Sequence, residues 1–288
     1  MQLSIIISTK NTAPALLATT LESLVTAVED SEIIVVDQNP DHRMRLVAEK
    51  FAVQKNNCDI QYLPSATVGL SRGRNVGFQA SRGTWLLFFD DDAIFSQETF
   101  LSIKDILQQE MSKKIIYYGK VLNSEDNKPY ITRSSIGTKK LSFFNFDTVC
   151  SIGLLFNRNV IEEIGFFDER FGVGSNFGAG EEADMILRSL SKSIPILYLP
   201  EFIVHHPKTQ SQPGKAFLYG KGLGALYRKH MSLPVIKLIT LLLKFFIEIG
   251  IRLAAGIVFL IGLKPYKMRY HFQYLKGFIQ GFLLYTKN

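Results

Sequence analysis

The sequence predicts an α/β protein in which a mostly parallel sheet is flanked by helices and is followed by a helical C-terminal segment. Short apolar runs rich in β-branched and aromatic residues alternate with helical patterns through the first half of the chain. The last part of the chain is basic and strongly apolar. A length of 288 residues, 47% of them hydrophobic, suits one sizeable domain and a shorter appendage. We therefore expect one domain over residues 1–206 and a separate helical segment over residues 207–288.

The expected strands lie at residues 3–8, 33–37, 59–63, 84–89, 115–121, 148–156 and 194–199. Helical spacing from Pro14 to Val28 joins the first two strands, so the chain opens with a β-α-β unit. In open α/β sheets, ligands bind beyond the carboxyl ends of the strands. The polar residues at those ends are Ser8, Thr9, Asp37, Asp90, Asp91 and Asp92. These residues are the first candidates for a binding site.

Two common classes of nucleotide chemistry are disfavoured by the turn after the first strand. Residues 8–11 contain no glycine, whereas a dinucleotide-binding turn is rich in glycine. The chain also lacks the phosphate-loop lysine motif. Cys58 and Cys150 are too few for a disulfide framework or a zinc site, and we expect both to be core thiols.

Three consecutive carboxylates, Asp90, Asp91 and Asp92, follow the apolar run 85–89. Negative charge at this density is costly where a buried strand emerges, unless a cation neutralises it. A hard divalent ion such as Mg²⁺ or Mn²⁺ prefers oxygen ligands of this kind and also bridges the oxygens of a diphosphate. The alternative is a solvated turn or a helix cap.

Several motifs occur in an order that resembles family 2 glycosyltransferases. They are Ser4 to Thr9, Glu32 to Asp37, Gly73-Arg74-Asn75-Val76-Gly77, Trp85 to Asp92, Ile164 to Gly172 and Gly180-Glu181-Glu182-Ala183-Asp184. The resemblance covers about residues 3–206. It implies a GT-A fold, a Rossmann-like α/β architecture, and transfer of a sugar from a nucleoside diphosphate sugar, such as a UDP-sugar.

The resemblance also implies roles for residues that bind the donor. Asp37 would hydrogen-bond the nucleotide base, a uracil in the first instance, with Thr9 nearby. Gln38-Asn39-Pro40 follow Asp37, where the family has another polar residue, Gly and Ser. Arg74 and Asn75 would contact the nucleotide, the arginine by paired hydrogen bonds to phosphate.

For the metal, the resemblance assigns Mn²⁺ or Mg²⁺ to Asp90 and Asp92 and places Asp91 with the nucleotide-binding residues. His206, the second residue of His205-His206, would reach the metal or the diphosphate. Adjacent histidines in a strand face opposite ways, so only one of the two reaches a given site. A structural role for the histidine is the alternative.

Inverting transfer needs a carboxylate that takes the proton of the attacking hydroxyl. The family has a Glu-Asp pair in this role, and the matching residues here are Glu181 and Glu182. We interpret Glu182 as the catalytic base, with Glu181 as the alternative. Asp184 and Arg188 lie four residues apart, and for them we expect a helical ion pair.

Residues 207–288 carry 13 Lys and Arg against one acidic residue, Glu248, and this net charge of +12 leaves −5 for residues 1–206. The charges alternate with long aliphatic runs, which favours an anionic membrane surface over nucleic acid. Lys237, Lys244, Glu248 and Arg252 recur at helical spacing, and we expect this stripe to face lipid headgroups. The longest uncharged run, 253–263, is shorter than the ~20 residues that a membrane-spanning helix needs. A helix packed on the core is the alternative.

The N-terminal residues have neither a basic region nor a small-residue cleavage site, so no signal peptide is predicted. We expect a peripheral or monotopic enzyme at the cytoplasmic face of the inner membrane. Its acceptor would be a hydroxyl of a lipid-linked or growing glycan in surface polysaccharide synthesis, as the resemblance implies. The alternatives are a nucleotidyltransferase acting on sugar phosphates and an inactive module that binds sugar or membrane.

Overall fold

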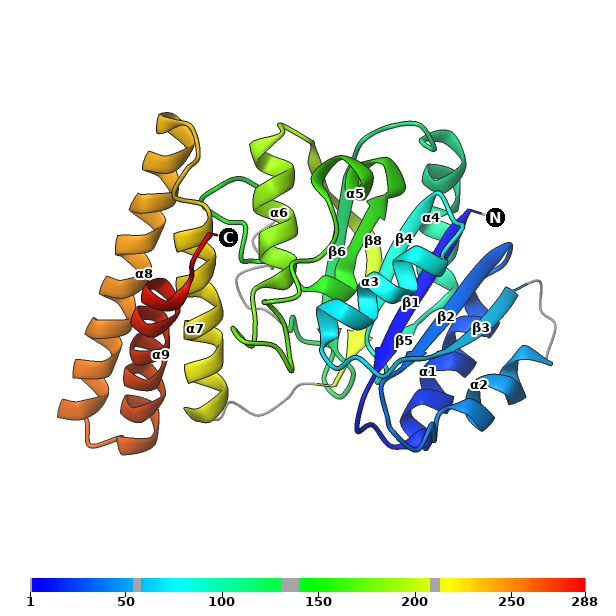
Figure 1. The fold of residues 1–288 in the computed structure, drawn as a ribbon, viewed down its shortest axis with the longest axis horizontal. Coiled ribbons are helices and arrows are strands. Elements are labelled where there is room, and N and C mark those ends of the chain that lie inside the picture. Colours follow the sequence, from blue (N-terminus) through cyan, green and yellow to red (C-terminus); the bar gives the residue numbers. More distant parts are fainter. Residues whose placement is uncertain (1, 54–57, 131–139, 208–212, 288) are drawn as a thin grey trace. The chain divides into compact units, whose positions relative to one another are not determined.

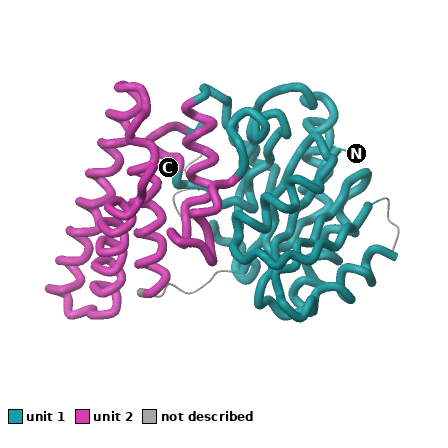
Figure 2. Tube along the Cα trace, in the orientation of Figure 1, with its two compact units in different colours: residues 1–141, 147–166, 192–208 teal, residues 142–146, 167–191, 209–288 magenta. Residues whose placement is uncertain are grey.

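The computed structural model of the chain describes residues 2–53, 58–130, 140–207 and 213–287 (Figure 1). The chain divides into two compact units (Figure 2). The first comprises Met1–Leu141, Asp147–Phe166 and Lys192–Lys208, and the second comprises Ser142–Phe146, Phe167–Ser191 and Thr209–Asn288. The division expected at residue 206 falls at the end of the last strand, but two earlier stretches group with the C-terminal residues.

The described residues of the first unit form one eight-stranded sheet with the order β3-β2-β1-β4-β7-β6-β8-β5. The strands are β1 (Leu3–Thr9), β2 (Ser31–Asp37), β3 (Cys58–Pro64), β4 (Trp85–Phe89), β5 (Ile94–Phe95), β6 (Ile116–Asn123), β7 (Leu154–Asn157) and β8 (Ile196–His206). Strands β1 to β4 are parallel, as are β6 and β8. Strand β7 is antiparallel to both neighbours, and β5 is antiparallel to β8. The mostly parallel sheet of the prediction is confirmed.

Two of the expected strands have different bounds in the structure. The run 148–156 begins as irregular chain and a 3-10 turn at Ser151–Gly153, and only Leu154–Asn157 is a strand. Strand β8 continues well beyond residue 199, because after a register shift it pairs again with Lys120 to Asn123 of β6. The bounds of a strand depend on which residues pair with a neighbouring strand, and apolar content alone does not show this pairing. Both differences follow from this.

Helices cover both faces of the sheet (Figure 1). In the first unit they are α1 (Pro14–Ala27), α2 (Arg45–Ala52), α3 (Leu70–Ala80), α4 (Gln97–Gln109) and α5 (Arg158–Ile164). Residues of α1, α2 and α4 share one buried cluster with alternate residues of β1, β2 and β4. On the other face, Gly77 of α3 lies so close to Ile6 that an added Cβ would come within 2.3 Å of its side chain.

The helices of the second unit are α6 (Glu181–Ser191), α7 (Pro213–Lys229), α8 (Val235–Ile261) and α9 (Pro265–Leu284). Helices α7 and α9 contact each other through glycines. A Cβ on Gly220 or Gly224 of α7 would come within 2.0 Å or 1.9 Å of a backbone oxygen of α9, and the same holds for Gly277 and Gly281 against α7. Four glycines therefore allow the two backbones to touch.

The polar stripe of α8 faces the interior of the second unit. Lys237 donates to the backbone oxygen of Ser191 at 2.7 Å, and Lys244 is buried over the ring of Phe146. Glu248 is 3% exposed and is paired with Arg252 at 2.9 Å. The expectation that this stripe faces headgroups is therefore wrong, because these charged groups find their partners within the protein.

The opposite face of α8 is apolar and exposed. Its exposed large side chains are Val235, Ile236, Ile239, Leu243, Phe246, Ile247, Ile251, Leu253, Ile257, Val258, Leu260 and Ile261. Within the described part of the chain, no helix combines the length and the apolar character needed to cross a membrane.

Candidate active site

The polar residues at the strand ends meet at one edge of the sheet because the strands are parallel. Thr9 of β1 lies opposite Asp37 of β2, and Ile7 lies opposite Phe89 of β4. Asp90, Asp91 and Asp92 therefore leave the sheet beside the end of β1. The candidate residues that end β1, β2 and β4 thus lie at one edge of the sheet.

Four of the predicted residues form one polar cluster in the first unit. The Nε2 atom of His206 lies 3.0 Å from Oδ1 of Asp92 and 3.5 Å from Oδ2 of Asp90. The guanidinium of Arg74 lies 3.3 Å from the other oxygen of Asp90. Strand β8 brings His206, across a separation of more than a hundred residues, to the two carboxylates with which the resemblance grouped it.

The cluster shifts the pKa values of its members. Burial lowers the pKa of His206, but hydrogen bonds and charge attraction from Asp90 and Asp92 outweigh this effect and raise it to about 10. Burial raises the pKa of Asp90, but His206 together with Arg74 brings it below its ordinary value. The protein therefore holds an imidazolium between two carboxylates when no other cation is present.

The donor atoms of these residues are of the kind that bind divalent cations. His206 Nδ1 contacts the backbone oxygen of Pro207 at 2.8 Å, an arrangement that leaves Nε2 for a ligand in the neutral ring. The two carboxylates are oxygen donors of the kind that Mn²⁺ and Mg²⁺ prefer. Among the residues that the structure describes, no three such side chains are already arranged around a common point. Metal binding would therefore replace the direct contacts between His206 and the carboxylates.

Asp91 lies in a different environment from its two neighbours. Burial raises the pKa of its carboxyl group, and the charges of Asp90 and Asp92 act in the same direction. Side-chain hydrogen bonds with Thr12 and Thr9 act in the opposite direction, but the effect of burial is larger.

Arg74 and Asn75 lie on α3, and both side chains are buried. Besides Asp90, the Arg74 guanidinium donates to Oγ of Ser151 at 2.9 Å. The Arg74 charge is therefore buried beside the carboxylate cluster. Gly73, the residue before it, permits the approach of α3, since an added Cβ would come within 2.0 Å of Ser8 Oγ.

Asp37 is fully buried within a closed network. One carboxylate oxygen accepts from the backbone N–H and the side chain of Asn39, and the other accepts from Tyr62 and Met44. Hydrogen bonding of Tyr62 to Asp37 adds to the effect of burial and raises the pKa of Tyr62 to about 12. Through its hydrogen bonds to Asn39 and Met44, Asp37 fixes the conformation of the loop that follows β2.

A cavity of about 790 Å³ lies at the carboxyl ends of β1, β2 and β3. Its lining residues are Lys10, Asn11, Gln38, Asn39, Pro40, His42, Pro64, Ser65, Ala66 and Val68. Asp37 is not among them. Asn11, Gln38 and Asn39 line this cavity but were not predicted as site residues. Their positions directly after the first two strands could have indicated them.

The candidate bases Glu181 and Glu182 belong to the second unit. They begin α6, directly after a loop in which Gly172, Gly174, Gly178 and Gly180 all have positive φ. Glycine adopts this backbone conformation without steric cost, which permits the loop to fold tightly before the helix. Glu181 is buried, Glu182 is partly buried, and both are placed at the helix end that favours negative charge.

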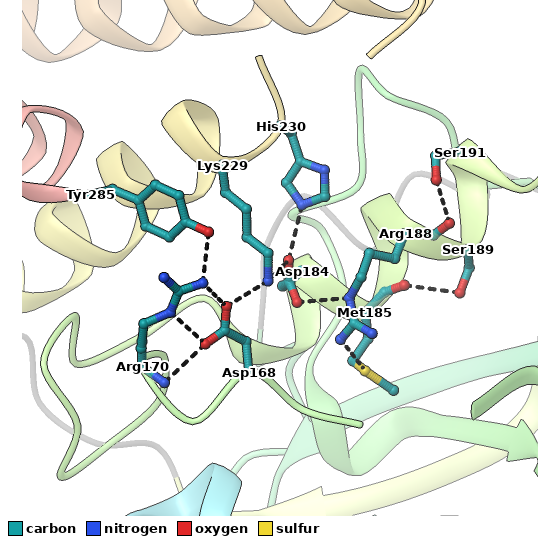
Figure 3. Close-up of polar contacts among 10 residues, drawn as sticks. All are labelled: Asp168, Arg170, Asp184, Met185, Arg188, Ser189, Ser191, Lys229, His230 and Tyr285. Atoms are coloured by element: carbon teal, nitrogen blue, oxygen red, sulfur yellow. Dashed lines mark hydrogen bonds and ion pairs between the residues drawn. The ribbon is translucent and has the colours of Figure 1, made fainter. Parts of the chain in front are cut away.

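A network of charged residues fixes α6 and the loop before it to α7 (Figure 3). Asp184 is fully buried and contacts Arg188, Lys229 and His230 at 2.9, 2.8 and 2.9 Å. The predicted ion pair between Asp184 and Arg188 is confirmed. Burial raises the pKa of Asp184, but its contacts with His230, Arg188 and Lys229 outweigh this effect and hold the pKa well below the usual range.

The same network reaches the end of the chain through Arg170 (Figure 3). Arg170 is paired with Asp168 at 2.7 Å and donates to the hydroxyl of Tyr285 at 2.7 Å. Lys229 bridges Asp168 and Asp184. This connection cannot be read from the sequence, because its members come from three separate parts of the chain.

A family model described as Glycosyl transferase family 2 matches residues 4–165. An uncharacterized glycosyltransferase of Bacillus subtilis (strain 168), EpsJ, is 30% identical over 128 residues, which cover 44% of this chain and 36% of the relative. An uncharacterized glycosyltransferase of Haemophilus influenzae is 33% identical over 121 residues, which cover 40% of this chain and 38% of the relative. The matched region thus spans little more than a third of these relatives.

Solved structures are similar over nearly the whole chain. The mannosyltransferase PcManGT from Pyrobaculum calidifontis, in complex with GDP-Man and Mn²⁺, has a TM-score of 0.67 at 13% identity and covers 97% of this chain and 86% of its own. S. aureus TarS in complex with UDP-GlcNAc has a TM-score of 0.55 at 15% identity, with coverage of 96% and 92%. At these identities the likeness concerns the fold, which is of the GT-A type in agreement with the prediction.

Proposed function

Because the chain belongs to glycosyl transferase family 2 and is therefore a glycosyltransferase, we propose that it performs metal-dependent, inverting transfer of a sugar from a nucleoside diphosphate sugar. The acceptor is a hydroxyl of a lipid-linked or growing glycan. The observation that carries the proposal is the cluster of Asp90, Asp92, His206 and Arg74 at the carboxyl edge of the sheet.

The cavity beyond β1, β2 and β3 is the site proposed for the nucleoside. Its volume of about 790 Å³ is in the range of sites that hold a nucleotide. Gln38 and Asn39 line this cavity, but both are buried, and their amide groups already bond to Gly69, Asp37 and Asn11, so they shape the wall against which the nucleoside would lie. Asp37 contributes indirectly, because its four hydrogen bonds fix Asn39 and the start of α2.

The diphosphate is assigned to the carboxylate cluster that follows β4. Asp90, Asp92 and His206 would hold Mn²⁺ or Mg²⁺, and Arg74 would add a fixed positive charge. When bound, the ion neutralises the charge that develops on the departing diphosphate. A complex of PcManGT contains Mn²⁺ and GDP-Man, which supports this assignment.

Glu182 is the proposed base, and Glu181 is its alternative. The carboxylate takes the proton of the acceptor hydroxyl while the acceptor oxygen forms a bond to the anomeric carbon. The bond from that carbon to the diphosphate oxygen breaks with its electron pair, and the nucleoside diphosphate leaves. Attack on the side opposite the leaving group inverts the anomeric configuration. The acidic start of α6 after a glycine-rich loop supports this role.

Association with an anionic membrane, at the cytoplasmic face, is proposed for the second unit. The exposed face of α8 is apolar along its length, whereas its charged residues are turned inward. Burial of apolar side chains in lipid is favourable by ~25 cal/mol per Å². Lys264 and Lys267 follow α8 directly, and basic groups at headgroup depth are attracted to anionic lipid. This arrangement supports contact of α8 with acyl chains and a role in surface polysaccharide synthesis.

The donor is identified by screening UDP-, GDP- and dTDP-sugars against the full chain with and without Mn²⁺. A ligand that binds only the folded protein raises its melting temperature. We expect one nucleotide class to stabilise the protein, and to do so more strongly with Mn²⁺. Transfer then releases a nucleoside diphosphate, whereas a nucleotidyltransferase would release pyrophosphate from a nucleoside triphosphate. Release of pyrophosphate, or donor binding indifferent to Mn²⁺, would refute the proposal.

A further inference from the structure

A second cavity, of about 530 Å³, lies entirely within the second unit. It is formed where α7 ends and where the chain leaves α9, and its lining residues are Arg228, Met231, Ser232, Leu283, Tyr285, Thr286 and Lys287. These residues have no part in the donor site described above. The lining contains two cations, three hydroxyl groups and two apolar side chains, but no carboxylate.

The two cations have no carboxylate partner among the residues that the structure describes. Arg228 is exposed, with its guanidinium 5.7 Å from the centre of the Phe282 ring and 3.9 Å from Met231 Sδ. Lys287 donates a hydrogen bond to Ser232 Oγ. Both positive charges therefore remain available for an anion, and the hydroxyl of Thr286 adds a further polar group to the lining.

The nearby carboxylates are already neutralised by other cations. Asp168 contacts Arg170 and Lys229, and Asp184 contacts Lys229, Arg188 and His230 (Figure 3). The pKa of Asp168 is lowered to about 2 because its hydrogen bonds with Arg170 and Lys229 outweigh the effect of burial. These carboxylates thus have little capacity to compete for Arg228 and Lys287.

One wall of the cavity is held firmly in place. Arg170 donates to the backbone oxygen of Thr286 at 3.1 Å and to the hydroxyl of Tyr285, and its guanidinium lies 4.6 Å from the centre of the Tyr285 ring. The Tyr285 ring also packs 5.7 Å from the ring of Phe177. A fixed wall reduces the entropy that ligand binding must overcome.

The apolar part of the lining continues onto an apolar surface. Leu283 lines the cavity and is 73% exposed, and its neighbours Leu284 and Ile279 on α9 are more than half exposed. A ligand with charge at one end and hydrocarbon at the other matches this sequence of groups. An inorganic anion has no hydrocarbon that could contact Met231 and Leu283, and a free nucleotide has no hydrocarbon chain that could do so.

We propose that this cavity binds the phosphate or diphosphate group of a lipid, with Arg228 and Lys287 pairing with the phosphate oxygens and Met231 and Leu283 contacting the first part of the hydrocarbon chain. The phosphate belongs either to an isoprenoid diphosphate or to a bilayer phospholipid. The proposal is independent of the sugar donor, and it concerns binding rather than catalysis.

The test is calorimetric titration of the full chain with geranyl diphosphate in the presence of EDTA, which prevents metal-dependent binding at the donor site. Pyrophosphate and geraniol test the head and the tail separately. We expect geranyl diphosphate to bind about tenfold or more tightly than pyrophosphate, because only the former uses the apolar wall. Binding should persist when UDP and GDP are present in excess.

Arg228→Gln and Lys287→Gln should each weaken binding about tenfold, since each removes one charge-assisted contact. Lys276→Gln is the matched control, because Lys276 is an exposed cation of α9 outside the cavity. Lys287 follows the last helix, so its substitution tests the site even if the change on α7 impairs folding. Equal weakening by Lys276→Gln, equal affinity for pyrophosphate, or no binding of geranyl diphosphate would overturn the proposal.

Vesicles distinguish the two sources of the phosphate. Phosphatidylglycerol vesicles and phosphatidylcholine vesicles are compared for the wild-type protein and the two variants. A loss of vesicle binding parallel to the loss of geranyl diphosphate binding supports a bilayer phospholipid as the ligand. Retained vesicle binding supports an isoprenoid diphosphate. Because neither arm measures transfer, failure of this proposal and failure of the proposed enzymatic function are distinguishable.

Discussion

At the residue scale, Asp92 provides the most direct test of the donor site. Its carboxylate follows β4 and lies 3.0 Å from Nε2 of His206. Asp92→Ala should reduce transfer by about 10³-fold or more and remove the Mn²⁺-dependent part of donor binding, because one metal ligand is lost. The melting temperature should change little, since the side chain is partly exposed. Activity and thermal shift with and without Mn²⁺ measure both effects.

Glu22→Ala is the control for this prediction. Glu22 is an exposed acid on α1, so its loss changes the net charge by the same amount without touching the cluster. If Asp92→Ala retained normal turnover with Mn²⁺, the metal would have to be assigned to other residues.

Glu182 and Glu181 are distinguished by amide substitution. Glu182→Gln keeps the size of the side chain but removes the proton acceptor, so transfer should fall by about 10²–10⁴-fold while donor affinity stays nearly constant. Glu181→Gln should have a much smaller effect. Initial rates and donor titration separate the two outcomes. Inactivity of Glu181→Gln alone would exchange the two roles.

At the element scale, the contact between α7 and α9 depends on glycine. An alanine Cβ at Gly224 would come within 1.9 Å of the Phe278 oxygen, and one at Gly281 would come equally close to the Lys221 oxygen. Either substitution should therefore destabilise the protein by about 1–3 kcal/mol, because the helices must separate.

Gly250→Ala is the matched control, since Gly250 lies in α8 and an added Cβ meets nothing within 4 Å. Alanine should stabilise the protein there by about 0.5–1 kcal/mol, because glycine is a poor helix former. Urea unfolding measures all three variants. Equal stability of the Gly224 and Gly250 variants would contradict the close packing of α7 and α9.

The charged network that joins the loop before α6 to α7 should make the free energy of unfolding depend on pH in the acidic range. The pKa of Asp168 is lowered to about 2 from an ordinary value of 3.8. A lowered pKa stabilises the folded state above the unfolded pKa, and this stabilisation is lost as the pH falls from ~4 towards ~2. The contribution at neutral pH is on the order of 2 kcal/mol, because a tenfold change in an acid dissociation constant corresponds to ~1.4 kcal/mol.

Asp168→Asn removes this titrating group. The variant should be less stable than the wild type at pH 7, and the difference should shrink markedly at pH 2.5. Urea unfolding at the two pH values provides the comparison. The same difference at both pH values would mean that the charge of Asp168 does not stabilise the fold.

At the scale of the whole molecule, membrane association should have two separable parts. The full chain should sediment with anionic liposomes, and high salt should weaken this binding without abolishing it, because salt screens the basic residues but not apolar burial. Replacing Leu243, Phe246 and Ile257 with Gln should remove the salt-resistant part at little cost to stability, since all three are exposed. Sedimentation at low and high salt measures both parts.

Lys276→Gln should affect only the salt-sensitive part and serves as the control. Removal of α8 and α9 is a poorer test, because it would uncover the glycines of α7 and the Tyr227 side chain, which contacts Phe245 and Phe278. Unchanged sedimentation of the triple variant at high salt would exclude α8 as the lipid-binding face.

The sequence by itself determined the order of the first strands, the carboxylates after β4 and the helix that begins at Glu181. These features are local, because alternating or continuous apolar runs and the polar residues that end them can be read from neighbouring positions. The motifs were also sufficient to indicate the family, which the family model confirms for residues 4–165.

Only the tertiary structure decided which distant groups meet. His206 contacts Asp90 and Asp92 because β8 extends beside β6. Asp37 is closed off by Tyr62 and Met44, although its place at a strand end resembles that of an exposed ligand-binding residue. The charged stripe of α8 turns inward for the same physical reason. Helical spacing shows that the charges share one face of the helix. The partners that neutralise these charges come from other parts of the chain, and they determine which way that face points.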